Sequence, residues 1–134
     1  MNNNLIDFET NVFNICLEYD ISIPEDIRRI LLHQYVNSTH SIEITGKGFY
    51  DNIIISKECE KIPYDNFRFG CIYIEFENTD DALGMVVFVI DGCISLIEFY
   101  SYSEQWDCKI TNYNIFLVRD NGELSFLKKV NVSN

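Results

Sequence analysis

The chain has 134 residues, of which 47% are hydrophobic and 23% are charged, and its formal net charge at pH 7 is −11. This length and composition are typical of one folded domain with one core, which we expect to comprise residues 1–134. The excess of carboxylates argues against nucleic acid or an anionic membrane surface as a direct partner, because phosphates would be repelled, and favours a cationic protein surface.

Two amphipathic helices are predicted at the N-terminus. Apolar residues recur at three- and four-residue spacing over residues 4–19, which predicts the first helix. A second helix is expected to begin after the break at Pro24 and to end near Val36. Ser22 is predicted to cap it, with Glu25 as the capping-box partner three residues later.

From residue 42 onward the chain consists of short β-rich runs separated by turn residues. Met85–Ile90 is apolar on both faces, and Asp91-Gly92 follows as a signal for a two-residue type I′ turn into Cys93–Tyr100. We therefore predict an antiparallel hairpin whose first strand is central in the sheet. Two helices followed by about six strands predict an α+β fold, with both helices packed on one face of a mostly antiparallel sheet.

The cysteines and the apolar runs bear on location. Five cysteines are an odd number without a C-x-x-C pair and mostly fall within apolar patterns, so we expect reduced thiols. Apolar runs such as Met85–Ile90 are far shorter than the roughly 20 residues that span a bilayer. The first four residues also lack the features of a signal peptide. We therefore predict a cytoplasmic protein that does not insert into a membrane.

Histidine and cysteine residues have no spacing typical of a catalytic or metal site. His33 falls on the second predicted helix and His40 at its exit, and no cysteine sits at a glycine-rich elbow. Neither histidine belongs to an H-x-x-x-H or C-x-x-C pattern. We therefore predict no metal site, no cofactor and no enzymatic activity.

Carboxylates could also hold a divalent ion for hydrolysis. Phe69–Glu77 is predicted to form one strand in which Tyr73, Glu75 and Glu77 share the polar face. No Lys or Arg lies nearby to stabilise a phosphoryl transition state. A solvated sheet face or a protein-binding face is therefore favoured. A small hydrolase that uses Glu75, Glu77 or Cys93 is the enzyme alternative.

The forty residues from Phe69 to Cys108 hold eight carboxylates and no Lys or Arg. A packed sheet with so much unpaired negative charge repels itself, which favours binding to a basic partner. Tyr and Trp side chains at the end of the predicted hairpin offer large contact areas, with the alternative that Phe99 and Trp106 are core residues. The residues predicted to contact the partner are Asp80, Asp81, Glu98, Tyr100, Tyr102, Glu104, Trp106 and Asp107.

Several short motifs between residues 43 and 117 follow one another in the order of a known family. They are Ile44-Thr45-Gly46-Lys47-Gly48-Phe49-Tyr50, Leu83-Gly84-Met85, Val89-Ile90-Asp91-Gly92-Cys93-Ile94, and Leu96-Ile97-Glu98-Phe99-Tyr100-Ser101-Tyr102 with Trp106. The series resembles a family of small bacterial proteins with a T-G-x-G-F-[FY] start, a D-G hairpin, a Leu-Glu pair and an aromatic tail ending near W-P. Here Ile97 precedes Glu98 where Leu is usual, and Asp107 replaces the Pro.

Some members of that family look like immunity proteins encoded beside secreted toxin domains, including those of contact-dependent growth inhibition systems. The resemblance implies a protein that binds and neutralises a cognate toxin domain, with its acidic surface occupying the basic cleft of a nuclease. A homo-oligomer, such as a homodimer whose sheet edge or doubly apolar strand is completed by a second copy, is the structural alternative.

Overall fold

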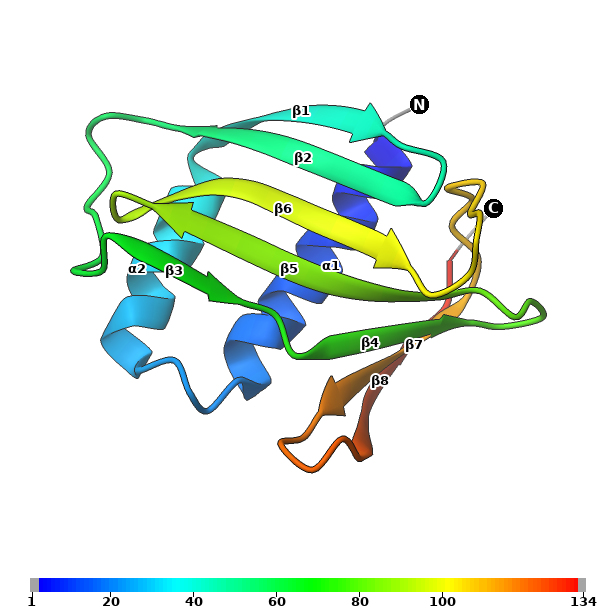
Figure 1. Cartoon of the computed structure of the whole chain (residues 1–134). Helices are drawn as coiled ribbons and strands as arrows, with labels where there is room; N and C mark the ends of the chain where they lie inside the picture. The colour runs from blue at the N-terminus through cyan, green and yellow to red at the C-terminus, as the bar shows by residue number, and fades with distance from the viewer. Residues whose placement is uncertain (1–2, 133–134) are drawn as a thin grey trace.

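The computed structural model describes residues 3–132 and contains, within that range, two helices followed by eight strands (Figure 1). The α+β class is confirmed, and the sheet has eight strands rather than about six. The elements are α1 (Asn3–Tyr19), α2 (Glu25–Val36), β1 (Ser38–Ile44), β2 (Gly48–Ile55), β3 (Asn66–Phe69), β4 (Ile72–Phe76), β5 (Ala82–Ile90), β6 (Cys93–Ser101), β7 (Tyr113–Val118) and β8 (Leu124–Val130).

Gly70 divides one β-rich run of the sequence into two strands. Its φ is 139°, and a Cβ atom there would lie 2.3 Å from the carbonyl oxygen of Met85. The backbone approaches β5 so closely at this point that only glycine fits. The run from Phe69 to Glu77 therefore becomes β3 and β4, which pair with different parts of β5.

The strand pairings in the described residues are all antiparallel. The order is β1-β2-β6-β5-β4-β7-β8, with β3 paired to β5 beside this path. β5 is therefore central, as predicted. At the β5–β6 turn Asp91 and Gly92 have φ of 52° and 78°, and Ile90 pairs with Cys93, which confirms the predicted hairpin.

The turn between α1 and α2 is closed by Arg28 rather than by the predicted capping box. Pro24 occupies the N-cap position of α2, and no side chain in the described chain caps it. Because Ser22 Oγ donates to Asp20 Oδ1 at 2.5 Å, the hydroxyl is already engaged and the predicted role of Ser22 is wrong. The guanidinium of Arg28 donates to the carbonyl oxygen of Glu18 at 2.9 Å and links the two helices.

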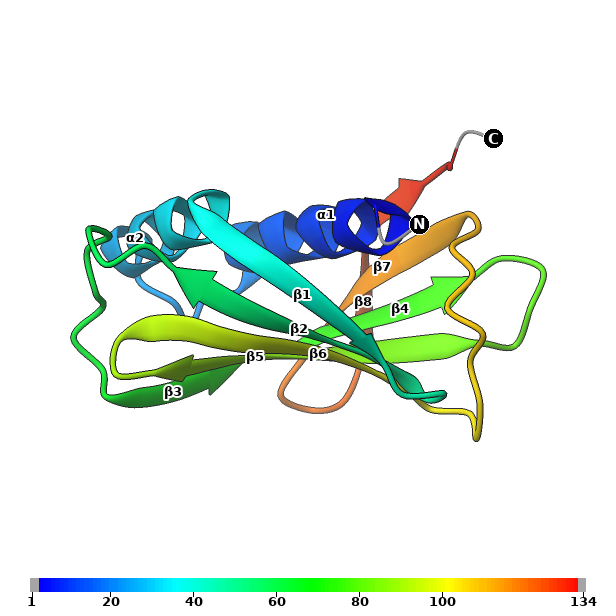
Figure 2. The ribbon, with the colours of Figure 1, turned by 90° about the horizontal axis from the view of Figure 1, so that it is seen from above.

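The helices lie in one layer on a single face of the sheet, and the core fills the space between the layers (Figure 2). The Phe8 ring of α1 has its centroid 5.9, 5.1 and 4.9 Å from those of Phe76, Phe99 and Tyr113. Trp106, from the segment between β6 and β7, is 4% exposed and stacks on Phe76 at 5.5 Å. Aromatic contacts of Phe8 thus attach α1 to three strands, β4, β6 and β7.

Each helix buries one side and exposes the other, as its sequence periodicity predicts. Among residues 3–132 no helix combines the length and the apolar character needed to cross a bilayer. The residues that α2 buries against the sheet are Ile27, Ile30, Leu31, Gln34 and Tyr35.

Gly48→Ala is expected to lower the free energy of unfolding by about 3 kcal/mol or more. Gly48 has φ of 153°, and a Cβ atom there would lie 1.9 Å from the carbonyl oxygen of Phe99, so β2 and β6 would have to separate. Urea unfolding followed by circular dichroism measures this cost.

Gly122→Ala is the matched control. Gly122 has φ of 85°, but apart from chain neighbours its added Cβ would meet no described heavy atom within 4 Å. Gly122→Ala should lower the free energy of unfolding by only about 1 kcal/mol, because it introduces backbone strain alone. Equal costs at the two positions would contradict the close approach of β2 to β6.

Candidate functional site

The open face is the side of the sheet on which the described residues place no helix (Figure 2). Successive strand residues point to opposite faces. In β6, Ile97 and Phe99 are buried toward the helices, so Glu98 and Tyr100 project from the open face. By the same alternation, Tyr73 of β4 projects from it.

Five aromatic side chains form a continuous band on the open face, which we call the aromatic row: Tyr100, Tyr102, Tyr73, Phe116 and Phe126. Neighbouring ring centroids are, in that order, 5.6, 5.5, 6.1 and 5.7 Å apart. Tyr102 is 60% exposed and Phe126 is 59% exposed. The row therefore presents large apolar areas to solvent from the end of β6 to β8.

Gly84 of β5 allows the row to cross the centre of the sheet. Gly84 pairs with Tyr73 on one side and with Tyr100 on the other. A Cβ atom on Gly84 would lie 2.3 Å from Cζ of the Tyr100 ring. The missing side chain thus leaves the space in which the Tyr100 ring lies.

An acidic hollow adjoins the aromatic row where β4 turns into β5. Tyr73 lines it together with four carboxylate residues, Glu75, Glu77, Asp80 and Asp81. Asp80 is exposed and Asp81 is half-buried. The hollow thus joins the predicted acidic loop to the aromatic surface.

The hollow keeps most of its negative charge unpaired. Lys129 Nζ lies 3.1 Å from Glu77 Oε2, and this is an exposed pair that screens one carboxylate. Burial raises the pKa of Tyr73, and the adjacent Glu75 carboxylate raises it further. Burial and the Tyr102 hydroxyl raise the pKa of Tyr100 to about 12. The phenol groups are therefore neutral at physiological pH and can donate hydrogen bonds beside the carboxylates.

The structure separates the eight predicted partner-binding residues into four locations. Glu98, Tyr100 and Tyr102 lie on the open face, Asp80 and Asp81 border the acidic hollow, Glu104 and Asp107 are exposed between β6 and β7, and Trp106 lies in the core. The β4–β5 connection, which contains Asp80 and Asp81, and the β6–β7 connection, which contains Glu104 and Asp107, lie at the same end of the molecule (Figure 1).

Trp106 is the one predicted contact residue that the structure moves away from the surface. Its backbone N–H donates to the carbonyl oxygen of Gly46 at 2.9 Å, which folds the segment over the β1–β2 turn. Its ring then stacks on Phe49 and Phe76, with centroids 6.3 and 5.5 Å apart. The alternative in which Trp106 closes the core is therefore the correct one.

Three members of the aromatic row, Tyr73, Phe116 and Phe126, were not among the predicted contact residues. Alternation placed Tyr73 on the polar face of its strand, but nothing local indicated that it would meet Phe116. Register brings them together, because Tyr73 pairs with Phe116 across β4 and β7, and Phe116 pairs with Phe126 across β7 and β8.

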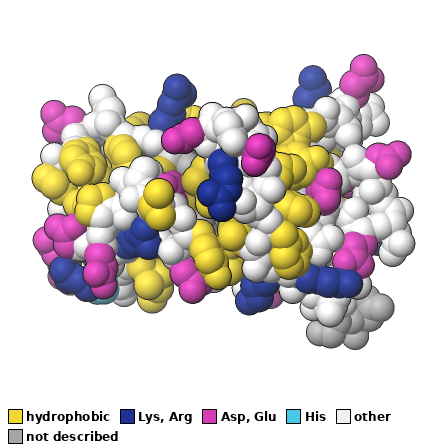
Figure 3. Space-filling model, turned by 90° about the horizontal axis from the view of Figure 1, so that it is seen from below, with side chains coloured by type: hydrophobic (Ala, Val, Ile, Leu, Met, Phe, Trp, Pro, Cys, Tyr) yellow, Lys and Arg dark blue, Asp and Glu magenta, His cyan; other side chains and the backbone are white. Residues whose placement is uncertain are grey.

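A second groove lies at the lower edge of the sheet, between β3, the tip of the β7–β8 hairpin and the α1–α2 turn. Figure 3 shows hydrophobic side chains on this side of the molecule, interspersed with Lys and Arg. The lining includes Arg68 and Arg119 as well as Asp20 and Asp120. Because both signs of charge occur, this groove has no evident preference for a charged partner.

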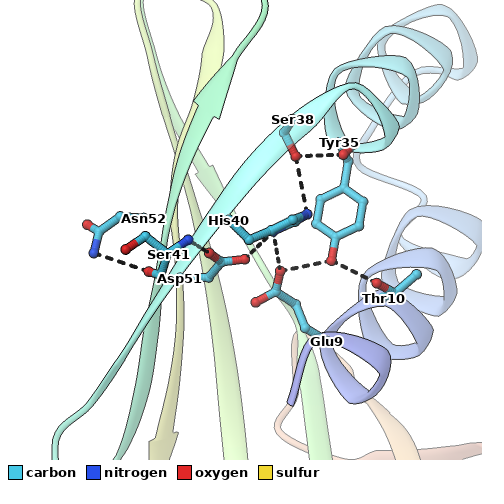
Figure 4. Close-up of polar contacts among 8 residues, drawn as sticks. All are labelled: Glu9, Thr10, Tyr35, Ser38, His40, Ser41, Asp51 and Asn52. Carbon is cyan, nitrogen blue, oxygen red and sulfur yellow. Dashed lines mark hydrogen bonds and ion pairs between the residues drawn. The ribbon is translucent and has the colours of Figure 1, made fainter. Parts of the chain in front are cut away.

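The covered face contains a buried polar cluster, formed by Glu9 of α1, Tyr35 of α2, His40 of β1 and Asp51 of β2 (Figure 4). His40 Nδ1 lies 2.5 Å from Asp51 Oδ2 and 3.8 Å from Glu9 Oε1. The Tyr35 hydroxyl donates to Glu9 Oε1 at 2.8 Å. The side chains of Glu9 and Asp51 are 0% exposed, and that of His40 is 18% exposed.

Burial and the adjacent Asp51 raise the pKa of Glu9 well above its usual range. Protonation of Glu9 is one way to accommodate two buried carboxyl groups, and coordination of a metal ion is another. Glu9, His40 and Asp51 each offer one ligand atom, and these three atoms lie within 4.8 Å of one another. Substrate chemistry is disfavoured, because both carboxylates are inaccessible. Glu75, named in the hydrolase alternative, is on the opposite face of the sheet.

Comparisons with protein-family models, with curated proteins and with solved structures find no match to this chain. The function proposed below therefore depends on the arrangement of these residues and on the motif resemblance described under Sequence analysis.

Gly84→Ala is expected to lower the free energy of unfolding by about 1–2 kcal/mol, because the new methyl group displaces the Tyr100 ring. In a Tyr100→Ala background the same substitution should cost almost nothing. A double-mutant cycle measured by urea unfolding gives this coupling directly. Additive costs would show that the ring does not occupy the space above Gly84.

Proposed function

We propose that this chain is an immunity-type protein that binds a cognate secreted toxin domain, of basic nuclease character, and neutralises it in the cytoplasm of the producing cell. The observation that carries the proposal is the exposed aromatic row on the open face, bordered by the acidic hollow.

The aromatic row supplies the kind of contact that anchors protein interfaces. Tyr and Trp are enriched among the residues that contribute most to binding, and contiguous exposed apolar patches are uncommon on monomers without a partner. Tyr102 and Phe126 hold more than half of their surface in solvent, so a partner can bury them. Phe126 lies in β8, and the backbone N–H of Tyr102, one residue after β6, donates to the carbonyl oxygen of Ala82 at 3.0 Å. Attachment to the sheet limits the entropy that both residues lose on binding.

The charge pattern favours a basic partner. Glu98 projects beside Tyr100, and Glu75, Asp80 and Asp81 surround the adjacent hollow. The segment between residues 69 and 108 contains no Lys or Arg that could neutralise them. Such a field accelerates association with a cationic surface and disfavours nucleic acid. Inhibition would be steric and electrostatic, with no reaction catalysed by this chain.

The same charges argue against self-association through this face. In a two-fold symmetric dimer each copy would present the same patch to the other. The two acidic hollows, each with one carboxylate, that of Glu77, paired to Lys129, would then be brought together, and like charges across an interface are costly. A basic protein is therefore the better complement of the open face.

The direct experiment is a calorimetric titration of the chain with the toxin domain encoded in the neighbouring gene. We expect a 1:1 complex and loss of toxin activity in the mixture. Absence of binding at micromolar concentration would contradict the proposal.

Two substitutions should separate the effect of charge on the association rate from the effect of aromatic contact on the dissociation rate. Glu98→Lys is expected to slow association about fivefold at low salt and to weaken its salt dependence. Tyr102→Ala is expected to raise the dissociation rate about tenfold or more, because it removes an anchor that the partner buries. Surface plasmon resonance at two salt concentrations measures both rates.

Matched controls come from the helix layer. Glu18→Lys makes the same change of charge at an exposed position of α1, and Tyr19→Ala removes a ring that is 40% exposed at the end of α1. Glu18→Lys should leave the association rate unchanged, and Tyr19→Ala should leave the dissociation rate unchanged. If the controls alter binding as strongly as the open-face variants, the binding face lies elsewhere.

A further inference from the structure

We propose that the buried polar cluster is a binding site for one divalent transition-metal ion, with Glu9, His40 and Asp51 as its protein ligands. The three residues come from α1, β1 and β2, and one ligand atom of each lies within 4.8 Å of the other two. The site is independent of the proposed partner surface, because it faces the helices.

An orphaned oxygen atom points to a missing ligand. Within residues 3–132, Glu9 Oε2 is buried and has no hydrogen-bond partner. The carboxyl group of Glu9 belongs to a side chain that is 0% exposed and is directed toward His40 and Asp51 (Figure 4). A buried polar atom without a partner is unfavourable, and a bound ion is one of its recognised explanations.

In both carboxylates a neighbouring group donates a hydrogen bond to the oxygen that is not proposed to bind the ion. The backbone N–H of Ser41 donates to Asp51 Oδ1 at 3.0 Å, which leaves Oδ2 directed at His40. The Tyr35 hydroxyl holds Glu9 Oε1 and leaves Oε2 without a partner. Secondary contacts of this kind orient the ligands of many metal sites.

His40 fits the same pattern through its tautomer. Its Nε2 lies 3.4 Å from Ser38 Oγ, and Ser38 Oγ itself donates to the carbonyl oxygen of Tyr35 at 2.7 Å. The Ser38 oxygen is therefore an acceptor toward the ring, which favours the proton on Nε2. An ion bound there would replace the proton of the hydrogen bond between Nδ1 and Asp51 Oδ2 and accept the lone pair of Nδ1.

Charge and ligand type favour zinc. Two carboxylates and a neutral imidazole around a divalent cation give a net charge of zero, which a buried site tolerates best. Imidazole with carboxylate suits Zn²⁺, whereas Mg²⁺ and Ca²⁺ prefer oxygen ligands alone. Water can occupy the fourth position of the tetrahedron.

Only small movements are needed to accommodate the ion. Zinc bonds of about 2.0–2.2 Å place ligand atoms roughly 3.3 Å apart in a tetrahedron. The distance between His40 Nδ1 and Asp51 Oδ2 would open from 2.5 Å, and the Glu9 carboxylate, whose Oε1 lies 3.8 Å from Nδ1, would turn its Oε2 toward the ion. The partly exposed edge of His40, at 18%, offers a route from solvent. The ion would then tie α1 to the β1–β2 edge of the sheet.

The experiment is a titration of chelator-treated protein with Zn²⁺ in competition with a chromophoric chelator. We expect one ion per chain, and a rise in the melting temperature that EDTA reverses. Failure of the wild-type chain to take up one equivalent of Zn²⁺ saturably would overturn the proposal without reference to any variant.

Variants locate the site. His40→Gln and Glu9→Gln should each weaken Zn²⁺ binding by about a hundredfold. His33→Gln, at the only other histidine, and Glu104→Gln, at an exposed carboxylate, should leave it unchanged. Circular dichroism checks that each variant is folded. If Glu9→Gln does not fold, the Zn²⁺ affinity of His40→Gln alone tests the assignment. Unchanged affinity in folded His40→Gln, or loss in His33→Gln, would overturn the assignment.

Discussion

In the described part of the chain both helices cover the same face of the sheet, and this asymmetry determines what each strand residue does. On the covered face, Phe8, Phe99, Tyr113 and their neighbours exclude water and attach α1 to the strands. Burial of such aromatic side chains is the main stabilising contribution that a chain of this size can obtain. The open face contributes little to that core, so its residues are freer to serve another purpose. Its aromatic row and carboxylates are therefore the natural place for a binding function.

The covered face also includes polar groups where the helix layer meets the edge strands β1 and β2. Asp51 occupies an inward position between Phe49 and Ile53, where alternation would place an apolar side chain. A buried carboxylate there needs compensation, which His40 and the backbone of Ser41 provide. Departures from the expected pattern are concentrated at functional or strained sites, and the buried polar cluster is such a departure.

Sequence patterns predicted the parts of the fold that depend on neighbouring residues. The periodicity of residues 4–19 gave the first helix nearly to its ends, and Asp91-Gly92 gave the β5–β6 turn, because local backbone preferences decide both. The division at Gly70 was missed because it depends on contact with Met85, fifteen positions along the chain. The prediction that Ser22 caps α2 was wrong because the Ser22 hydroxyl donates its hydrogen bond to Asp20, two residues earlier.

The candidate sites were harder to predict than the fold because they depend on strand order. Tyr73, Phe116 and Phe126 lie in three separate strands and become neighbours only through the β4–β7–β8 pairing. Spacing rules for metal ligands likewise detect residues on one helix or one turn. Glu9, His40 and Asp51 belong to three elements and show no such spacing. Charge was more informative, because a segment without Lys or Arg stays acidic however its strands are arranged.

The two sites lie on opposite faces of the same strands, and their functions are therefore separable. In β2, Asp51 points toward α1 while its neighbours Tyr50 and Asn52 point to the open face. Tyr50 pairs with Glu98 of β6, so the strand that carries a metal ligand also supports the acidic residue beside the aromatic row. An ion at the buried polar cluster would stiffen β1 and β2 without touching the surface that a partner contacts. Stability and recognition are thus assigned to different faces, and a substitution on one face can be interpreted without assuming an effect on the other.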